Sequence, residues 1–320
     1  MKKRDSEIAL SERRIVDKLD IISDSFSERI DIFLSEKLNR SRSYFKNLID
    51  EGLVTLNGKA CKPSSKVVGG DHIIVLIPDE NIDLTPKEID FEVIYDSKWY
   101  AVINKPAGLV VHPAPGNTTD TLVNGLLAKF KNIDDSDNVR PGIIHRLDKD
   151  TSGLLIIAKN RDVRQQMSEL FQKREVQKVY LAVCMGEPKN DYYMIDNFIG
   201  RSLTDRKKMA VLQNGGKRAI SEVKILKRSD GIFLASISIH TGRTHQIRVH
   251  MSYLNYPIVG DFLYGGAKVM KYGISRQALH AYKITFFDFY LGREVSYTAE
   301  IPEDIKYLIT KYRLYFDINS

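Results

Sequence analysis

The sequence predicts an α+β protein in which a large domain with a mixed β-sheet follows a small α/β domain. Its 320 residues can form two ordinary domains with buried cores. Strand-like and helix-like segments follow one another irregularly, which favours a mixed sheet over a βαβ repeat. Residues 78–89 are mostly polar and include two prolines, as is typical of a linker. We therefore expect an N-terminal extension at 1–26, a small domain at 27–77 and a large domain at 90–320.

Two helices and two strands are predicted in the small domain. Residues 29–38 carry apolar side chains at helical spacing, and serines directly after them can cap a second helix. Residues 53–57 and 72–77 are predicted strands, and Asn57-Gly58 is typical of a tight hairpin turn. Within the N-terminal extension, residues 14–19 could pair as a short strand.

The elements of the large domain follow from runs and alternations of apolar residues. A continuous apolar run at 153–158 predicts a buried strand, and Asn160 can cap an amphipathic helix after it. Alternating apolar and polar residues predict a half-buried strand at 232–240. The other predicted elements are strands at 91–95 and 99–103, a helix over 120–130 and a closing amphipathic helix over 303–315.

Charge favours a polyanionic partner. The chain has a net charge of +7 and a pI of about 9.1, although many basic proteins only have a solvated basic surface. The stretch 201–228 contains nine Lys or Arg and two acidic residues, so it alone carries a net charge equal to that of the whole chain. A surface that faces phosphates would explain this concentration.

Cysteine usage and hydropathy indicate a cytoplasmic protein. The two cysteines, Cys61 and Cys184, fall in different expected domains and suggest no disulfide framework and no metal cluster. The charged N-terminus lacks the apolar core of a secretory signal, and no apolar run approaches the length of a membrane span. We expect no membrane association, and the sequence implies no protein partner.

Asp148 is the principal candidate for a reactive group. It lies in the run HRLDKDTSGLLIIAK (145–159), in a polar loop directly before the buried strand. Asp residues beside Thr, Ser and Gly more often cap turns, and spacing alone favours that role. A calcium loop is the other alternative, but its twelfth position requires Glu and is Lys159 here. A carboxylate in a loop at a strand edge is well placed to meet a substrate.

Three basic residues gather at the second helix of the small domain. Arg40, Arg42 and Lys46 have no acidic residue between them. A helix start with positive side chains and free backbone N–H groups suits a phosphate. A solvated helix face is the alternative, and charge alone favours it.

Four segments, taken together, resemble the RluA family of RNA pseudouridine synthases. HRLDKDTSGLLIIAK resembles the family signature, in which the Asp of HRLD is catalytic. The other three segments follow the family order across residues 90–315. They are Asn104–Gly108 with Val111-His112-Pro113, Lys178–Val183, and Gly242–His250.

The small domain resembles the alpha-L RNA-binding module that often precedes such catalytic domains. The pattern comprises Arg29-Ile30-Asp31, Ser41-Arg42-Ser43, Leu48–Val54, Asn57-Gly58 and Gly70–Ile73. This resemblance implies that Arg40, Arg42 and Lys46 contact RNA.

The resemblance to the RluA family implies an enzyme that isomerises specific uridines of RNA to pseudouridine after flipping the base. The attached module favours large-subunit ribosomal RNA, with transfer RNA as the alternative substrate. A noncatalytic RNA-binding or ribosome-assembly factor is the rival class, and intact Asp148, Tyr180 and Arg248 argue against it.

The resemblance also assigns site residues. Asp148 would act as nucleophile or base, and the alternatives stay open. Arg248 would be the cation beside it, which favours the charged carboxylate. Tyr180 would pack on the uracil and remove the carbon-bound proton, and Arg146 would fill the gap left by the flipped base. The remaining expected RNA contacts of the large domain are His145, Arg243 and His245.

No cofactor and no metal ion are expected. Pseudouridine formation needs no redox step, because one bond to ribose is exchanged for another. His240, His245 and His250 are five residues apart, and such steps rotate about 140° on a helix. The three side chains therefore cannot all face one ion.

Overall fold

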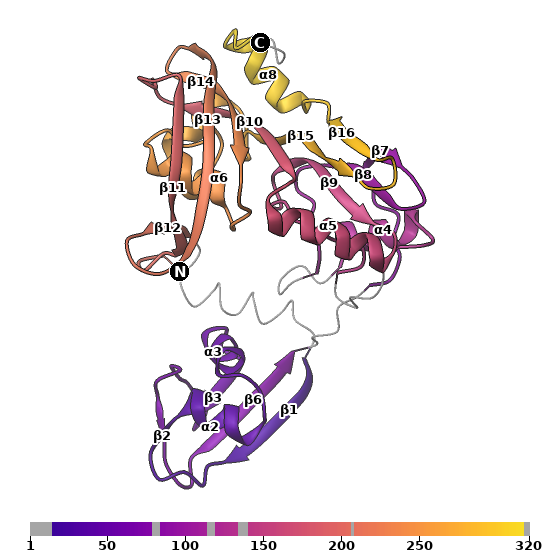
Figure 1. Ribbon diagram of the computed structural model, residues 1–320. Coiled ribbons are helices and arrows are strands. Elements are labelled where there is room, and N and C mark those ends of the chain that lie inside the picture. Colours follow the sequence, from indigo (N-terminus) through magenta and orange to yellow (C-terminus); the bar gives the residue numbers. More distant parts are fainter. Residues whose placement is uncertain (1–14, 79–83, 114–118, 134–139, 206–207, 317–320) are drawn as a thin grey trace. The chain divides into compact units, whose positions relative to one another are not determined.

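The chain divides into two compact units, Met1–Asn81 and Ile82–Ser320 (Figure 1). The computed structural model describes residues 15–78, 84–113, 119–133, 140–205 and 208–316. The boundary between the units falls inside the expected linker 78–89, part of which lies outside the described residues.

The small unit packs two helices on an antiparallel sheet with the strand order β1-β6-β3-β4. Its buried core joins apolar side chains of both helices to those of β3 and β6. Ser41 caps the second helix by accepting the Tyr44 N–H at 3.2 Å. The elements are β1 (Ile15–Ile22), β2 (Glu28–Arg29), α2 (Ile30–Lys37), α3 (Arg42–Asp50), β3 (Val54–Leu56), β4 (Lys59–Ala60), β5 (Lys66–Val67) and β6 (His72–Pro78).

The first strand corrects the expected extent of the small domain. We expected residues 1–26 to be an extension outside it, with only a short strand possible at 14–19. In the structure β1 runs antiparallel along β6, from Ile22 opposite His72 to Ile15 opposite Pro78. Leu19 also packs against the core of the small unit. The described part of the extension is therefore an integral edge strand of this unit.

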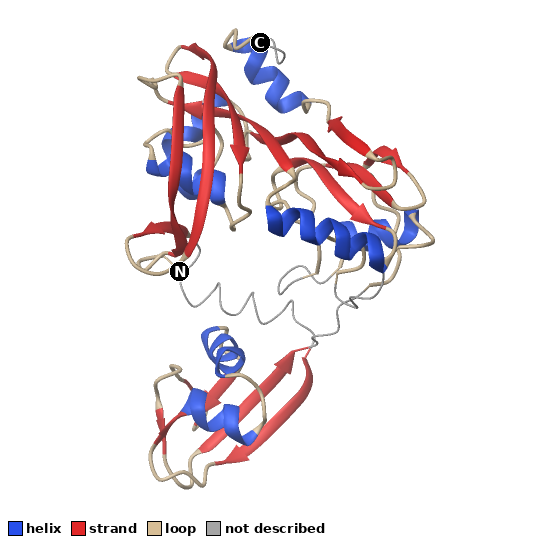
Figure 2. Ribbon diagram, viewed as in Figure 1, coloured by secondary structure: helices blue, strands red, loops and turns tan. Residues whose placement is uncertain are grey.

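The large unit is organised by one mixed sheet, as the sequence predicts. Among the described residues ten strands form it in the order β12-β11-β13-β14-β10-β15-β9-β8-β7, with β16 also paired to β15. β9 and β15 run parallel, whereas the other neighbours are antiparallel. The sheet and the helices beside it are shown in Figure 2. The strands are β7 (Glu92–Asp96), β8 (Tyr100–Lys105), β9 (Ser152–Ala158), β10 (Gln177–Met185), β11 (Tyr192–Arg201), β12 (Met209–Leu212), β13 (Lys217–Ser229), β14 (Ile232–Ile239), β15 (Leu279–Asp288) and β16 (Arg293–Thr298).

Helices cover both faces of this sheet near β9. Leu155 and Ile157 of β9 belong to the same core as α4, whereas Leu154 and Ile156 belong to the core with α5. Because successive strand residues point to opposite faces, α4 and α5 pack on opposite sides. The helices are α4 (Leu122–Lys129), α5 (Arg161–Lys173), α6 (Gln246–Tyr253), α7 (Phe262–Gly265), the 3₁₀ helix η1 (Gly266–Tyr272) and α8 (Glu303–Lys311).

All seven residues of β9 are buried, which fixes the loop before it. The strand is paired with β8 on one side and with β15 on the other. The polar run 145–151 therefore enters the sheet at a rigid place. No helix among the described residues has the length and apolar character needed to cross a membrane.

We expect Gly153→Ala to destabilise the large unit by about 3 kcal/mol or more. Gly153 has a φ of 118°, and a Cβ there would lie 2.3 Å from the Ala281 carbonyl oxygen of β15. The substitution would push apart the parallel strands that support the 145–151 loop. The free energy of unfolding, measured in urea, tests this expectation.

Gly231→Ala is the matched control for this substitution. Gly231 also has a positive φ, of 72°, but a Cβ there meets nothing within 4 Å. It should therefore cost only the strain of a left-handed residue, about 1 to 2 kcal/mol. Equal losses for the two variants would contradict the proposed clash with β15.

Candidate active site

The large unit contains a cavity of about 580 Å³ beside the start of β9. Its walls come from the loop before β9, from β10 and from the segment that leads from β14 into α6. These segments are far apart in sequence, and the sheet brings them together. Seven residues expected to form the site line this cavity: His145, Arg146, Asp148, Tyr180, Arg243, His245 and Arg248.

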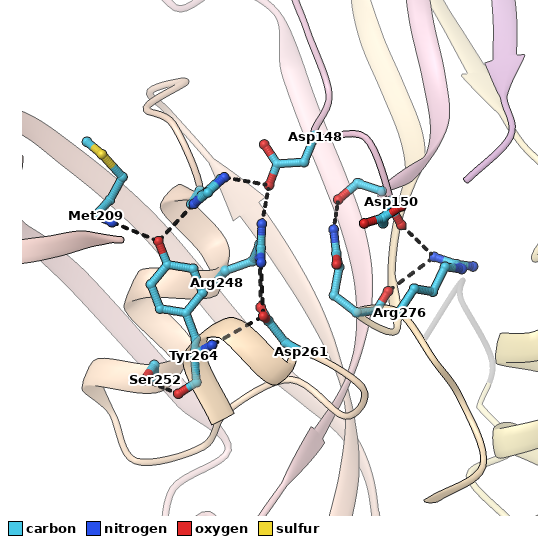
Figure 3. Close-up of polar contacts among 11 residues, drawn as sticks. Asp148, Asp150, Met209, Arg248, Ser252, Asp261, Tyr264 and Arg276 are labelled. Carbon is cyan, nitrogen blue, oxygen red and sulfur yellow. Dashed lines mark hydrogen bonds and ion pairs between the residues drawn. The ribbon is translucent and has the colours of Figure 1, made fainter. Parts of the chain in front are cut away.

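Arg248 lies between two carboxylates at one wall of the cavity (Figure 3). Its Nη1 donates to Asp148 Oδ2 at 3.1 Å. Its Nε and Nη2 donate to the two oxygens of Asp261 at 2.7 and 2.9 Å. The Asp261 side chain is 1% exposed and that of Asp148 is 20% exposed. The guanidinium is therefore anchored on a buried acid and presents one N–H to the acid in the cavity.

The charge on Arg248 is secured by these two acids. Burial opposes the charge, but the hydrogen bonds and opposite charges of Asp261 and then Asp148 outweigh it and raise the pKa of Arg248. A bidentate pair of this kind also fixes the plane of the guanidinium. Asp148 is held by one of its oxygens, and among the described residues no hydrogen bond is made by the other, Oδ1. That oxygen is available to a substrate.

Hydrogen bonds from the buried Lys105 hold the backbone of the loop 149–151. Lys105, which is fully buried, donates through Nζ to the carbonyls of Pro106, Leu109 and Lys149 at 2.7 to 2.9 Å. Burial lowers the pKa of Lys105 to about 7, with Asp150 opposing the shift. Three carbonyl acceptors require all three N–H groups of the ammonium, so this geometry belongs to the charged form.

Arg276 provides a second clamp on the same loop. Its Nη1 donates to the Asp150 carbonyl at 3.1 Å, and two other nitrogens donate to Asp304 of α8 at 2.6 and 2.7 Å. Gln277 donates from Nε2 to Thr151 Oγ1 at 3.2 Å. Hydrogen bonds thus connect the residues directly after Asp148 to the end of β8 and to the segment just before β15. Through Arg276 they are also connected to α8. This support limits the movement of the carboxylate.

Tyr180 and Lys178 line the cavity from one face of β10, two residues apart. Tyr180 is 7% exposed, and burial together with the charge of Asp148 raises its pKa. Its hydroxyl is therefore protonated at neutral pH. Burial lowers the pKa of Lys178 to about 8, and its ammonium lies over the Phe171 ring at 5.2 Å. We did not single out Lys178 from the sequence.

The structure gives His145 contacts that differ from those of an exposed RNA-binding side chain. Its Nε2 accepts the Ile156 N–H at 3.0 Å, and its ring stacks on Phe171 with centroids 4.7 Å apart. Burial and the nearby Lys178 charge lower the pKa of His145 to about 3. This neutral ring fastens the loop to β9, whereas the adjacent Arg146 is exposed at the cavity.

Arg243 and His245 form the wall that leads into α6. Arg243 donates from Nε to the Arg218 carbonyl at 2.9 Å, and its backbone N–H donates to Gln246 Oε1 at 3.0 Å. His245 places Nε2 3.9 Å from Asp148 Oδ2 and Nδ1 2.8 Å from the Tyr264 hydroxyl. The expected motif thus converges on Asp148 from a helix start.

Arg40, Arg42 and Lys46 belong to the small unit, where Arg40 precedes α3 and the other two lie in its first turns. Arg40 and Arg42 are exposed, and Lys46 is partly buried. Arg42 lies 3.4 Å from the buried carboxylate of Asp31, an acid that precedes this cluster in sequence. The Arg40 guanidinium lies over the Tyr44 ring at 5.4 Å.

Sequence reasoning missed Asp261, Lys105 and Arg276. Asp261 is separated from Arg248 by 13 positions, and no helical or strand period connects them. Its only local signal is that of a helix cap, since it accepts the Tyr264 N–H at 3.3 Å. Lys105 ends an apolar strand, where a lysine usually marks the return to solvent. Their roles depend on contacts that only the tertiary structure creates.

Comparison with known proteins defines the class to which this fold and site belong. A family model for RNA pseudouridylate synthase matches residues 99–253, and one for the S4 domain matches residues 28–73. Ribosomal large subunit pseudouridine synthase D of Neisseria meningitidis serogroup A is 41% identical over 304 residues, covering 91% of this chain and 80% of its own.

Two further similarities extend over most of the large unit. An uncharacterized RNA pseudouridine synthase of Bacillus subtilis, YlyB, is 40% identical over 290 residues, covering 90% of this chain and 95% of its own. The structure of Human RNA Pseudouridylate Synthase Domain Containing 1 shares the fold, with a TM-score of 0.55 and 24% identity over 71% of this chain and 96% of its own. The protein is an RNA-modifying isomerase. It belongs to the RluA-type RNA pseudouridine synthases with an N-terminal S4 RNA-binding domain, which confirms the family expected from the sequence.

Proposed function

We propose that this enzyme isomerises specific uridines of large-subunit ribosomal RNA and that Asp148 is its catalytic carboxylate. The observation that carries the proposal is the position of Asp148 in the cavity, held at one oxygen by Arg248 at 3.1 Å. The relatives from Neisseria meningitidis and Yersinia pestis, at 41% and 37% identity, are both described as ribosomal large subunit pseudouridine synthase D. The substrate in their names supports ribosomal RNA as the target of this chain.

The proposed reaction exchanges one bond to the ribose for another. The bond between the sugar and the uracil nitrogen breaks, the base turns, and a bond forms between the same sugar carbon and a ring carbon. The ring carbon loses its proton and the nitrogen gains one, so atoms and electrons balance without a cofactor. An ionised Asp148 serves either as the nucleophile or as the base that starts cleavage, and both routes use the oxygen that Arg248 does not hold.

Tyr180 is proposed to pack against the uracil ring. Burial raises the pKa of its hydroxyl, so the phenol is neutral when the reaction starts. It can take the carbon-bound proton only if its own proton leaves for a neighbouring group. The ring therefore serves first as an apolar surface beside Asp148, on which a flipped base can stack.

Arg146 and Arg243 are proposed to contact the RNA around the flipped uridine. Arg146 is exposed at the cavity, where its planar guanidinium can stack in the space left by the base. Arg243 donates from Nε to the carbonyl of Arg218, a residue of the basic stretch 201–228, at 2.9 Å. His145 is proposed to support these contacts indirectly by holding the loop to β9.

Tritium release from RNA labelled in uracil tests the proposed activity and its substrate together. Transcripts of large-subunit ribosomal RNA should release tritium with the wild-type enzyme, and transfer RNA should release much less. Mapping pseudouridines in ribosomal RNA from a strain that lacks the enzyme should then reveal the missing sites. Release from transfer RNA alone would overturn the ribosomal assignment, and release from neither RNA would overturn the activity proposed for Asp148.

We expect an enzyme without residues 1–81 to fold and to retain the chemical step, but to bind ribosomal RNA at least about tenfold more weakly at low salt. Each unit has buried cores of its own, and the two sets share no residue, so we expect the large unit to fold without the small one. The lost S4 domain carries Arg40, Arg42 and Lys46. Binding measured across a salt series should show a logarithmic slope smaller by about two to three.

A full-length triple variant, with Arg40, Arg42 and Lys46 each changed to Ala, is the matched control. It removes the three charges together with the Arg42–Asp31 contact, while Asp31 keeps its ion pair with Arg29 at 2.9 Å. We therefore expect the S4 fold to persist and most of the change in slope to be reproduced. An unchanged slope in both proteins would show that the S4 domain does not contact this RNA.

A further inference from the structure

The Tyr264 hydroxyl makes two hydrogen bonds that determine the protonation of His245. It accepts the Met209 backbone N–H of β12 at 2.9 Å and lies 2.8 Å from His245 Nδ1. A backbone N–H can only donate, so it occupies a lone pair of the phenol oxygen. Among the described residues the hydroxyl makes no other hydrogen bond, so its proton has an acceptor only if it is donated to Nδ1. The proton of the neutral imidazole is consequently on Nε2.

Nε2 of His245 faces Asp148. It lies 3.9 Å from Asp148 Oδ2, which is beyond hydrogen-bond reach, so its N–H is available to a substrate in the cavity. Figure 3 shows Tyr264, Asp148 and Arg248 around this position. The side chain of His245 is 21% exposed, close to the 20% of Asp148. The two groups thus share one partly enclosed space.

The backbone of His245 is held in an unfavourable conformation to achieve this placement. Its φ and ψ are 55° and 21°, in the left-handed region, which β-carbon-bearing residues adopt at a cost. At this helix start its side chain makes no capping hydrogen bond. Strain of this kind persists where the surroundings impose it, and such positions are concentrated at functional sites.

Burial keeps His245 neutral. Burial lowers its pKa, and the nearby charges of Asp148 and Asp261 are offset by those of Arg248 and Arg146. The Tyr264 hydroxyl is itself protonated, because burial raises its pKa. Because the imidazole of His245 is neutral, it adds no positive charge beside Asp148 on the side that faces the cavity.

We propose that Tyr264 is a positioning residue that fixes His245 as an Nε2–H donor to an oxygen of the flipped uridine, beside Asp148. The role of His245 rests on the proposed function. The hydroxyl of Tyr264 acts through His245 and through the backbone of β12, whereas its ring packs on the Arg248 guanidinium. The same hydroxyl therefore links the orientation of the imidazole to β12, which lies within the basic stretch 201–228.

The tautomer of His245 can be measured in the free protein by ¹⁵N chemical shifts of the imidazole nitrogens. We expect the wild-type ring to carry its proton on Nε2, and Tyr264→Phe to give a mixture of tautomers. The phenylalanine ring preserves the stacking with the Arg248 guanidinium, which lies 5.0 Å from the ring centre. A proton on Nδ1 in the wild type would overturn the proposal, whatever the activity of the enzyme.

A double-mutant cycle tests the effect on catalysis. We expect Tyr264→Phe to lower the single-turnover rate by about tenfold, the order expected for one oriented hydrogen bond, with little change in RNA affinity. His245→Gln places an amide N–H near the position of Nε2 and should retain more activity than His245→Leu. The glutamine has no tautomer to fix, so Tyr264→Phe should have a much smaller effect in the His245→Gln background.

The outcomes separate this proposal from the proposed function. Equal effects of Tyr264→Phe in both backgrounds would show a merely structural role and overturn the proposal. Thermal unfolding of each variant identifies any loss of folding, in which case the tautomer of the wild-type protein decides. If the wild type forms no pseudouridine, the proposed function fails, and the assigned tautomer still stands or falls by its ¹⁵N shifts.

Discussion

Asp148→Asn is expected to reduce pseudouridine formation by about 10⁴-fold or more, with RNA affinity changed by less than about threefold. The amide has the shape of the carboxylate, and its oxygen can still accept from Arg248 Nη1. In the wild type this nitrogen lies 3.1 Å from Asp148 Oδ2. It lacks the negative charge that a nucleophile or a base needs. Single-turnover measurements with labelled RNA, in a preparation free of wild-type enzyme, test the rate.

Asp150→Asn is the matched control for this loss. Asp150 lies in the same loop, where its backbone carbonyl accepts from Arg276 at 3.1 Å and its charge partly offsets the lowering of the Lys105 pKa by burial. The substitution removes the same charge two residues away and keeps that carbonyl. Its rate should stay within about tenfold of the wild type, since charge alone at this distance acts weakly. Measurable turnover by Asp148→Asn, or equal loss in both variants, would remove Asp148 from the mechanism.

The sequence predicted the local parts of the fold better than their order in space. The apolar run at 153–158 became the buried strand β9, and Asn57-Gly58 became a turn with positive φ at both residues. Local patterns determine such elements because the side-chain period or the turn chemistry is contained in a few residues. The parallel pairing of β9 with β15 joins residues 128 positions apart, and no local pattern specifies it.

The residues of the candidate site likewise fall into two groups: those that a sequence motif indicates and those whose roles depend on tertiary contacts. Asp148, Tyr180 and Arg248 were proposed from a resemblance, and the structure places all three at one cavity. Asp261 was not proposed, because its role is to pair with a guanidinium buried in the same place. His145 was expected to contact RNA, yet its ring accepts from the backbone of β9. The sequence around a histidine in a polar loop does not indicate a hydrogen bond to the backbone of a strand, because that contact forms only in the folded domain.

The Asp261–Arg248 pair shows why the supporting residues matter as much as the reactive one. An isolated arginine at the cavity wall could turn away from Asp148 toward solvent. Two bonds to an acid that is 1% exposed prevent this, because leaving would strand a buried charge. The cavity thus contains a cation whose position does not depend on the substrate. Electrostatic support of this preorganised kind needs no rearrangement during the reaction.

We expect Arg248→Met to lower the single-turnover rate by about 10³-fold or more and RNA affinity by less than about threefold. The thioether chain fills similar space but cannot donate to Asp148 or pair with Asp261. The same change leaves Asp261 as an unpaired buried charge, which costs about 3 to 5 kcal/mol of unfolding free energy. Urea unfolding and single-turnover rates should therefore both decrease.

Adding Asp261→Asn to Arg248→Met separates the two losses. The neutral amide removes the buried charge, so the double variant should regain much of the stability while its rate stays low. Arg243→Met is the matched control, because Arg243 lines the same cavity without contacting Asp148 through a described hydrogen bond. It should weaken RNA binding more than the chemical step. If Arg248→Met weakens only affinity and Arg243→Met weakens the rate, the essential cation of this site is Arg243.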